Sequence, residues 1–124
     1  MPRYWLTPPE FEYLREGRFD PTPYPHAFGD RNALLTHWEK PWYLNPPFAQ
    51  VTRFVRKAIE EGGPGKIIMP CPMAIHLLLE SGSGLEPAGR VRWIEVETGE
   101  RMKNPGLCLI ATIPARSTKV NDGP

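Results

Sequence analysis

The stretch WYLNPPFAQVTRFVRKAIEEGGPGKIIMP, Trp42 to Pro70, has two apolar segments that flank a helical pattern. Trp42 to Asn45 predicts a short buried strand, and Pro46 and Pro47 end it by removing two backbone donors and fixing two φ angles. Apolar residues after the prolines recur at i, i+3, i+4, i+7 and i+8, which predicts an amphipathic helix. They are Val51, Phe54, Val55, Ala58 and Ile59.

The segment behind this helix predicts a second strand. The helical pattern ends at Gly62, and Lys66 to Met69 is a short apolar run. GGPGK, Gly62 to Lys66, precedes that strand and opens no helix, so it predicts a turn and no phosphate loop. A further helix is predicted at Met73 to Glu80. The order strand, helix, strand, helix indicates an α/β fold with a mostly parallel sheet and right-handed crossovers.

Shorter elements are predicted on the N-terminal side of this unit. Thr7 can cap a helix from Pro8 to Glu16 that Gly17 closes. A very short strand at Phe19-Asp20 follows, and Asp30 could cap a brief helical turn through Leu34 and Leu35.

On the C-terminal side, Val91 to Val96 and Leu107 to Ile113 predict two more strands. A turn at Glu97 to Glu100 joins them, so we expect them to pair antiparallel and to give the sheet an antiparallel edge. The chain is predicted to form a single domain over residues 1–116, with residues 117–124 as a flexible C-terminal tail.

The composition is that of one soluble globular domain, with 124 residues, 40% of them apolar and 23% charged. Fifteen Lys and Arg against fourteen Asp and Glu give a net charge of +1, so there is no global attraction to nucleic acid or to an anionic membrane. The sequence shows neither a signal peptide nor an apolar run of membrane-spanning length. A cytoplasmic protein without membrane contact is expected.

The cysteines and histidines predict neither a disulfide nor a metal site. Cys71 and Cys108 each lie in or beside an apolar run, which favours buried thiols in a reducing cytosol. His26, His37 and His76 share no metal-ligand spacing with the cysteines.

Two polar strand ends are candidates for a functional site, Asp20-Pro21 and Asn45 to Phe48. Ligands of parallel α/β sheets bind at the carboxyl ends of the strands. The prolines would hold the Asn45 side-chain carbonyl and the Pro46 backbone carbonyl as converging acceptors, with the Phe48 ring beside them. Such a trio suits a planar amino group, because both of its hydrogens are accepted while the ring stacks on its plane.

Accepting both hydrogens would change the reactivity of that amino group. The lone pair of an amino nitrogen on a purine is delocalised into the ring, so the nitrogen is a poor nucleophile. Two acceptors draw its hydrogens out of conjugation and make the lone pair available without a strong base. The chemistry that fits is attack on an activated methyl group, and a duplex base could reach such a pocket only by flipping out of the stack.

The tetrad Asn45 to Phe48 resembles the catalytic motif of S-adenosylmethionine-dependent amino methyltransferases, which is Asp, Asn or Ser, two prolines and an aromatic residue. A longer ordered series resembles the phage and prophage DNA N-6-adenine methyltransferase family over Tyr4 to Ile113. The series is YWLTPPEF, FDPTPYP, NALLTHWEKPWYLNPPF, FVRKAIEEG, KIIMP and NPGLCLIATI.

The resemblance implies a fold, a reaction and a setting. The fold would be a minimal Rossmann-like methyltransferase domain. The reaction would transfer a methyl group from S-adenosylmethionine to the exocyclic amino group of adenine in DNA. The setting would be the cytoplasm of a phage-infected or prophage-bearing bacterial host.

The resemblance also implies roles for single residues. The catalytic residues would be Asn45, Pro46, Pro47 and Phe48. The cofactor contacts would be Trp5, Thr7, Pro8, Asp20 and Pro21. Asp20 matches the acidic residue after the first strand, and Trp5 to Pro8 match a Trp-x-Thr-Pro opening near the methionine end of the cofactor. Arg53 would meet a DNA phosphate at the start of the next helix.

The chain departs from the family pattern in three places. Asn32-Ala33-Leu34 stands where the family often has Asp-Gly-Leu, Pro70 to Ala74 replaces a Pro-x-Arg segment, and no Gly-x-Gly loop follows Asp20. Two alternatives therefore stay open. One is a catalytically inactive methyltransferase-like binding or assembly subunit, and the other is an amino methyltransferase that acts on RNA or on a protein glutamine. A homo-oligomer or a partner subunit could supply target recognition.

Each candidate residue also has a purely structural alternative. Asn45 to Phe48 could form a strand-ending turn, Asp20 an Asx-turn, and Thr7 a helix cap. Arg53 could belong to a solvated helix face.

Overall fold

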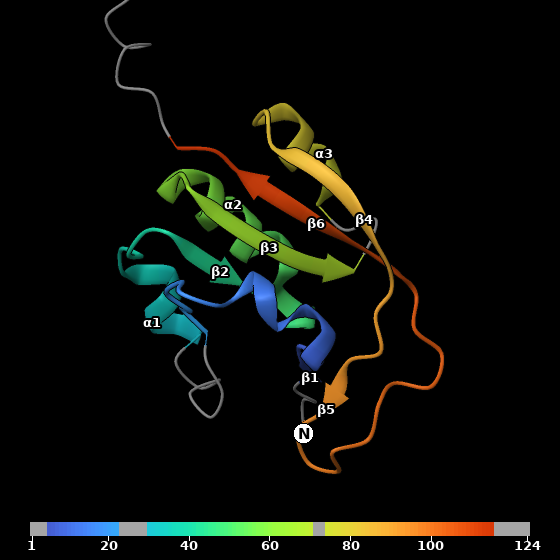
Figure 1. The fold of residues 1–124 in the computed structure, drawn as a ribbon. Coiled ribbons are helices and arrows are strands. Elements are labelled where there is room, and N and C mark those ends of the chain that lie inside the picture. Colours follow the sequence, from blue (N-terminus) through green and yellow to red (C-terminus); the bar gives the residue numbers. More distant parts are fainter. Residues whose placement is uncertain (1–4, 23–29, 71–73, 116–124) are drawn as a thin grey trace, which may run out of the picture.

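The computed structural model describes residues 5–22, 30–70 and 74–115, and its largest feature is a four-stranded sheet (Figure 1). The strands lie side by side in the order β2, β3, β6, β4. They are β2 (Trp42–Leu44), β3 (Gly65–Pro70), β4 (Gly84–Arg90) and β6 (Leu107–Ile113). A separate two-stranded ribbon joins β1 (Trp5–Leu6) antiparallel to β5 (Ile94–Glu95).

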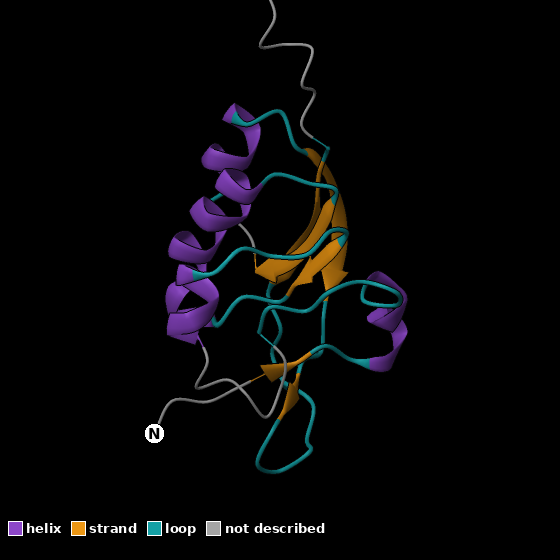
Figure 2. Ribbon diagram, turned by 90° about the vertical axis from the view of Figure 1, so that its left-hand side faces the viewer, coloured by secondary structure: helices purple, strands orange, loops and turns teal. Residues whose placement is uncertain are grey.

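Helices cover both faces of the large sheet (Figure 2). On one face lie α1 (Asp30–Leu35), α2 (Val51–Glu61) and α3 (Ile75–Glu80). On the other face lies the 3-10 helix η1 (Pro9–Leu14), with the β1–β5 ribbon beyond the end of the sheet. A second 3-10 turn, η3 (Phe48–Gln50), leads directly into α2.

The prediction of a mostly parallel, Rossmann-like sheet is wrong. Of the described pairs in the large sheet only β2–β3 is parallel, because β6 runs antiparallel to both β3 and β4. A parallel return needs a crossover connection, normally a helix, and the described chain between β4 and β6 contains only the short strand β5. The strand–helix–strand order of residues 42–70 therefore predicts only the parallel pair β2–β3 correctly. The other two strand pairs of the large sheet are antiparallel.

The pairing predicted for the C-terminal strands is also wrong, although the bounds of β6 agree with the prediction. The segment 91–96 forms only β5, which pairs with β1. The antiparallel neighbour of β6 at the sheet edge is β4, whose register shifts between Pro87 and Gly89. The sequence GLEPAGR of β4 has no apolar alternation, so no strand was predicted there.

Alternation along the central strands divides the core into two layers. Residues of β2 and β3 show it: Trp42 and Leu44 belong to the layer under α1–α3, whereas Tyr43 and Ile68 belong to the layer under η1. The helix-side layer also contains Val51, Phe54, Val55, Ala58, Ile67, Met69 and Leu78. The η1-side layer also contains Leu14, Val91, Trp93, Cys108 and Ile110. Because both faces are covered, the central strands are apolar on both sides.

The other local predictions have mixed outcomes. The helix predicted from Val51 is confirmed as α2 and ends before Gly62, and the helical turn predicted through Leu34 and Leu35 is confirmed as α1, which already includes Asp30. The helix predicted from Pro8 to Glu16 is the shorter η1, and Thr7 does not cap it. Phe19 forms an isolated parallel bridge with Trp42 in place of a strand.

Some predictions fall partly outside the described residues. The helix expected from Met73 is described only from Ile75 as α3. Cys108 is buried, as predicted, whereas Cys71 and the tail at residues 117–124 lie outside the described ranges.

Candidate functional site

Two of the predicted site residues, Asp20 and Asn45, lie near the carboxyl end of β2 and are linked through Thr22. The backbone of Phe19 lies beside β2, with its N–H 2.9 Å from the Pro41 oxygen and its carbonyl 2.8 Å from the Tyr43 nitrogen. This pairing is parallel, so Asp20 leaves Phe19 at the same edge where Asn45 leaves β2. The geometry therefore keeps one local feature of the predicted site although the sheet is different.

The Asn45 carboxamide has one engaged end and one free end. Its Nδ2 donates a hydrogen bond to the Trp5 carbonyl at 3.0 Å. Its Oδ1 is fully buried and has no hydrogen-bond partner within the described ranges. An unpaired buried acceptor costs about 1–3 kcal/mol, so folded proteins rarely keep one without a reason.

Asp20 is held in a tight turn beside Asn45. Its Oδ1 accepts the Thr22 N–H at 3.0 Å, as in an Asx-turn, and its Oδ2 lies 3.9 Å from Arg15 Nη1. The Thr22 hydroxyl donates to the Asn45 backbone oxygen at 3.4 Å and so connects the two residues. Burial raises the pKa of Asp20, and the Thr22 N–H and Arg15 only partly oppose that effect.

An aromatic cluster packs around Phe48. The ring of Trp5 is stacked with that of Phe48 at a centroid distance of 6.4 Å and an interplanar angle of 17°. Trp93 meets Phe48 edge-on at 5.2 Å and 82°. Pro46 is buried, and the Pro47 carbonyl accepts the Gln50 N–H at 2.9 Å. The double proline thus ends β2 and starts η3, with the half-buried Phe48 ring against two tryptophans.

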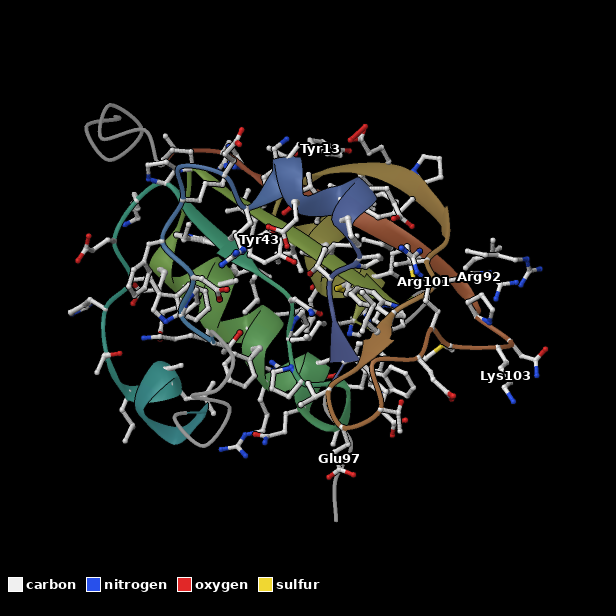
Figure 3. The ribbon with its side chains drawn as sticks, turned by 60° about the horizontal axis from the view of Figure 1, so that its bottom comes forward. Tyr13, Tyr43, Arg92, Glu97, Arg101 and Lys103 are labelled. Carbon is white, nitrogen blue, oxygen red and sulfur yellow. The ribbon has the colours of Figure 1, made fainter. Side chains whose placement is uncertain are left out.

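Thr7 belongs to the site through Tyr43. The two hydroxyls form a hydrogen bond, and Tyr43 is a buried residue of β2 (Figure 3). Burial raises the pKa of the Tyr43 phenol, so the hydroxyl stays neutral. Pro8 is buried, and its carbonyl accepts the Phe11 N–H at 2.9 Å at the start of η1.

The remaining predicted residues lie at the margin of the site. Pro21 is half-buried in the turn after Asp20. Arg53 is exposed on the first turn of α2, and its Nη1 donates to Gln50 Oε1 at 3.1 Å. A guanidinium at this position is compatible with both a solvated helix face and a phosphate contact.

Sequence reasoning missed three residues that build the site, Thr22, Tyr43 and Trp93. Thr22 had a usable signal, because a threonine two residues after Asp20 is typical of an Asx-turn. Tyr43 and Trp93 had none, since both stand in apolar runs that predict only core positions.

Two oxygen atoms at this strand end are chemically suited to accept hydrogens from a ligand. Asp20 Oδ2 is a carboxylate oxygen at a strand end, suited to accept hydrogen bonds from hydroxyl groups. The orphan Asn45 Oδ1 is suited to accept an amino hydrogen. Among residues 5–22, 30–70 and 74–115, no group of three His, Cys, Asp or Glu side chains could hold a metal ion. No described helix is long and apolar enough to cross a membrane.

No protein-family model, curated protein or solved structure matches the chain.

Proposed function

We propose that the protein transfers a methyl group from S-adenosylmethionine to the exocyclic amino group of adenine in DNA. The observation that carries this proposal is the buried Asn45 Oδ1 without a partner, at a strand end beside Asp20. An acceptor kept unpaired at a cost in stability is explained when a ligand supplies the missing hydrogen.

Each residue of the tetrad has a role in this proposal. Asn45 Oδ1 accepts one amino hydrogen and the Pro46 carbonyl accepts the second, which frees the nitrogen lone pair. Phe48 stacks on the base, and Pro47 fixes the turn that places Phe48 at the start of η3.

The same proposal assigns the cofactor and the partner. S-adenosylmethionine would supply an activated methyl group when bound: its S–CH3 bond would break as the N–CH3 bond forms, S-adenosylhomocysteine would leave, and the amino nitrogen would release one proton to water. Asp20 and Pro21 would hold its hydroxyl-bearing part, and Trp5, Thr7 and Pro8 the methionine end. Arg53 would contact a phosphate of DNA whose adenine is flipped out, and a second copy or another subunit would supply target recognition. The setting is the cytoplasm of a phage-infected or prophage-bearing bacterium.

Mass spectrometry of adenine-containing DNA after incubation with S-adenosylmethionine tests the reaction. We expect N6-methyladenine with the native chain, and a loss of at least about a hundredfold with Asn45→Ala, as for the removal of one catalytic acceptor or donor. Asn104→Ala, at an exposed asparagine, is the matched control and should keep full activity. Methylation that survives Asn45→Ala would remove Asn45 from its role.

The acceptor could instead be a guanine amino group in RNA or a glutamine side chain of a protein, since both have the same two amino hydrogens. The same incubation with RNA and with glutamine-containing peptides separates these substrates from DNA. Methyl transfer to only one of the three identifies the acceptor class.

A second function, ligand binding without turnover, is favoured by the packing of the site. Asn45 Oδ1 has no solvent contact, and two tryptophans contact the Phe48 ring. Calorimetric titration with S-adenosylmethionine is the test, with Asp20→Asn as the variant. Saturable binding that this variant weakens, without methyl transfer to any acceptor, supports the binding subunit. Absence of binding by the native chain excludes both functions.

A further inference from the structure

The orientation of the Asn45 carboxamide is set by the chain segment that crosses it. A carboxamide can turn by 180° and exchange its oxygen and its NH2 group at nearly equal steric cost. The Trp5 carbonyl, 3.0 Å from Nδ2, accepts a hydrogen only when nitrogen faces it. In the turned orientation two oxygens would face each other. Trp5 therefore fixes Oδ1 as the free end.

Three contacts hold Trp5 at this position. Its strand β1 pairs with β5 over only two residues, and its ring stacks on Phe48. The third contact is the hydrogen bond between Thr7, two residues after Trp5, and Tyr43, two residues before Asn45.

The Thr7–Tyr43 and Trp5–Asn45 hydrogen bonds join the same two chain segments. Trp5 and Thr7 are two residues apart, as are Asn45 and Tyr43, and the contacts follow opposite order along the two segments. Side chains two residues apart on an extended chain point to the same side, so Tyr43 and Asn45 both reach the N-terminal segment. Tyr43 is 1% exposed and has a fixed position in the core.

We infer that Tyr43 is a positioning residue for Asn45. Its hydroxyl holds Thr7, and the Trp5 carbonyl then keeps the Oδ1 end of the carboxamide as the free acceptor. Without this hydrogen bond the N-terminal segment loses its contact with Tyr43, so β1 is held less firmly and the carboxamide turns more freely.

This inference rests on the proposed function where it concerns reactivity. A free Oδ1 accepts a hydrogen from an amino group, whereas a turned carboxamide would present N–H donors to N–H donors. Tyr43 thus controls the fraction of molecules whose Asn45 is correctly oriented, and it does so without touching the amino group.

Nuclear magnetic resonance of the Asn45 side-chain NH2 group tests the inference directly, with its signals assigned by their absence in Asn45→Ala. In Tyr43→Phe we expect hydrogen exchange of this group to be about two- to tenfold faster, the effect of one lost hydrogen bond. Tyr13→Phe, at an exposed tyrosine of η1 (Figure 3), is the matched control and should leave exchange unchanged. Unchanged exchange in Tyr43→Phe overturns the inference. If that variant fails to fold, Thr7→Val removes the same hydrogen bond at nearly constant shape.

Kinetics separate the inference from the proposed function. A role in orientation lowers kcat in Tyr43→Phe by about the same two- to tenfold factor. If the native chain transfers no methyl group, the proposed function fails, and the exchange rates still decide whether Tyr43 orients Asn45. If the native chain is active and Tyr43→Phe keeps both exchange and kcat, the inference fails and the function stands.

Discussion

Asn45 places a hydrogen-bond donor against the Trp5 carbonyl, where an aspartate would place a second acceptor. We therefore expect the new carboxyl of Asn45→Asp to have a raised pKa, because its ionised form is buried against an oxygen. A raised pKa in the folded state means that the protonated form is favoured. The variant should thus lose stability relative to the wild type at about pH 7 and regain it as the pH falls to about 4.

Urea unfolding at both pH values measures this difference. Asn45→Ala, which introduces no ionisable group, is the control and should differ from the wild type by the same amount at each pH. A difference for Asn45→Asp that does not change with pH would contradict the contact with Trp5.

Glu61 is the most buried of the described charged residues, and its hydrogen-bond and ion-pair partners keep its carboxylate ionised. Its carboxylate accepts the Trp38 N–H at 2.9 Å and pairs with Lys57 Nζ at 2.9 Å and His37 Nδ1 at 3.1 Å. Burial alone would raise its pKa, but the Trp38 N–H, Lys57 and His37 together lower it to about 2.

This pKa predicts acid sensitivity. A lowered pKa in the folded state contributes stability above about pH 4.5, and the contribution is lost as the pH falls towards about 2. Its size is about 3 kcal/mol. Glu61→Gln should be less stable than the wild type at neutral pH and should lose less stability on acidification. Glu97→Gln, on an exposed turn (Figure 3), should follow the wild type in urea unfolding from pH 6 to pH 2.

At the scale of elements, Gly65 allows β2 and β3 to approach. A Cβ on Gly65 would overlap the ring of Trp42, which is fully buried and donates from Nε1 to the Gly62 carbonyl at 2.9 Å. We expect Gly65→Ala to lower the free energy of unfolding by about 1–3 kcal/mol, as overpacking does in well-packed cores. Gly106→Ala is the control, because no atom lies near its added methyl group. Equal unfolding midpoints for the two variants in urea would show that Trp42 can move aside.

Sequence patterns predicted the elements whose residues are buried in a regular order. The apolar residues of α2 recur at helical spacing, and β2 is bounded by prolines. The strand β4 could not be predicted, because its glycines, proline and charges become extended only by pairing with β6. Propensity within one element says nothing about such a partner.

For the candidate site, too, the sequence predicted what depends on neighbouring residues and not what depends on distant ones. The position of Asn45 at a strand end follows from the adjacent prolines, which act locally. Its contact with Trp5 joins residues forty positions apart and depends on how β1 folds back over the sheet. The free acceptor therefore became visible only with the fold.

At the scale of the molecule, the large sheet and the β1–β5 ribbon should differ in local stability. The sheet is buried between two layers, whereas each strand of the ribbon has two residues. Hydrogen exchange of backbone amides in the native protein measures this. We expect the Met102 N–H, bonded to the Trp93 carbonyl beside the ribbon, to exchange faster by at least about tenfold than the Ile68 N–H in β3.

Such local opening bears on access to the site, because β1 carries the carbonyl that contacts Asn45. A ribbon that opens without unfolding the sheet would expose Oδ1 to solvent. Equal protection of the two amides would mean that the ribbon opens only when the whole protein unfolds.

The shifted register of β4 at Pro87 and Gly89 has a consequence for behaviour in concentrated solution. A proline has no N–H to offer an incoming extended chain, and an irregular border interrupts the ladder that such a chain would need. Residues Pro87 to Gly89 therefore impede edge-to-edge aggregation through β4. Many β-rich proteins precipitate by this route.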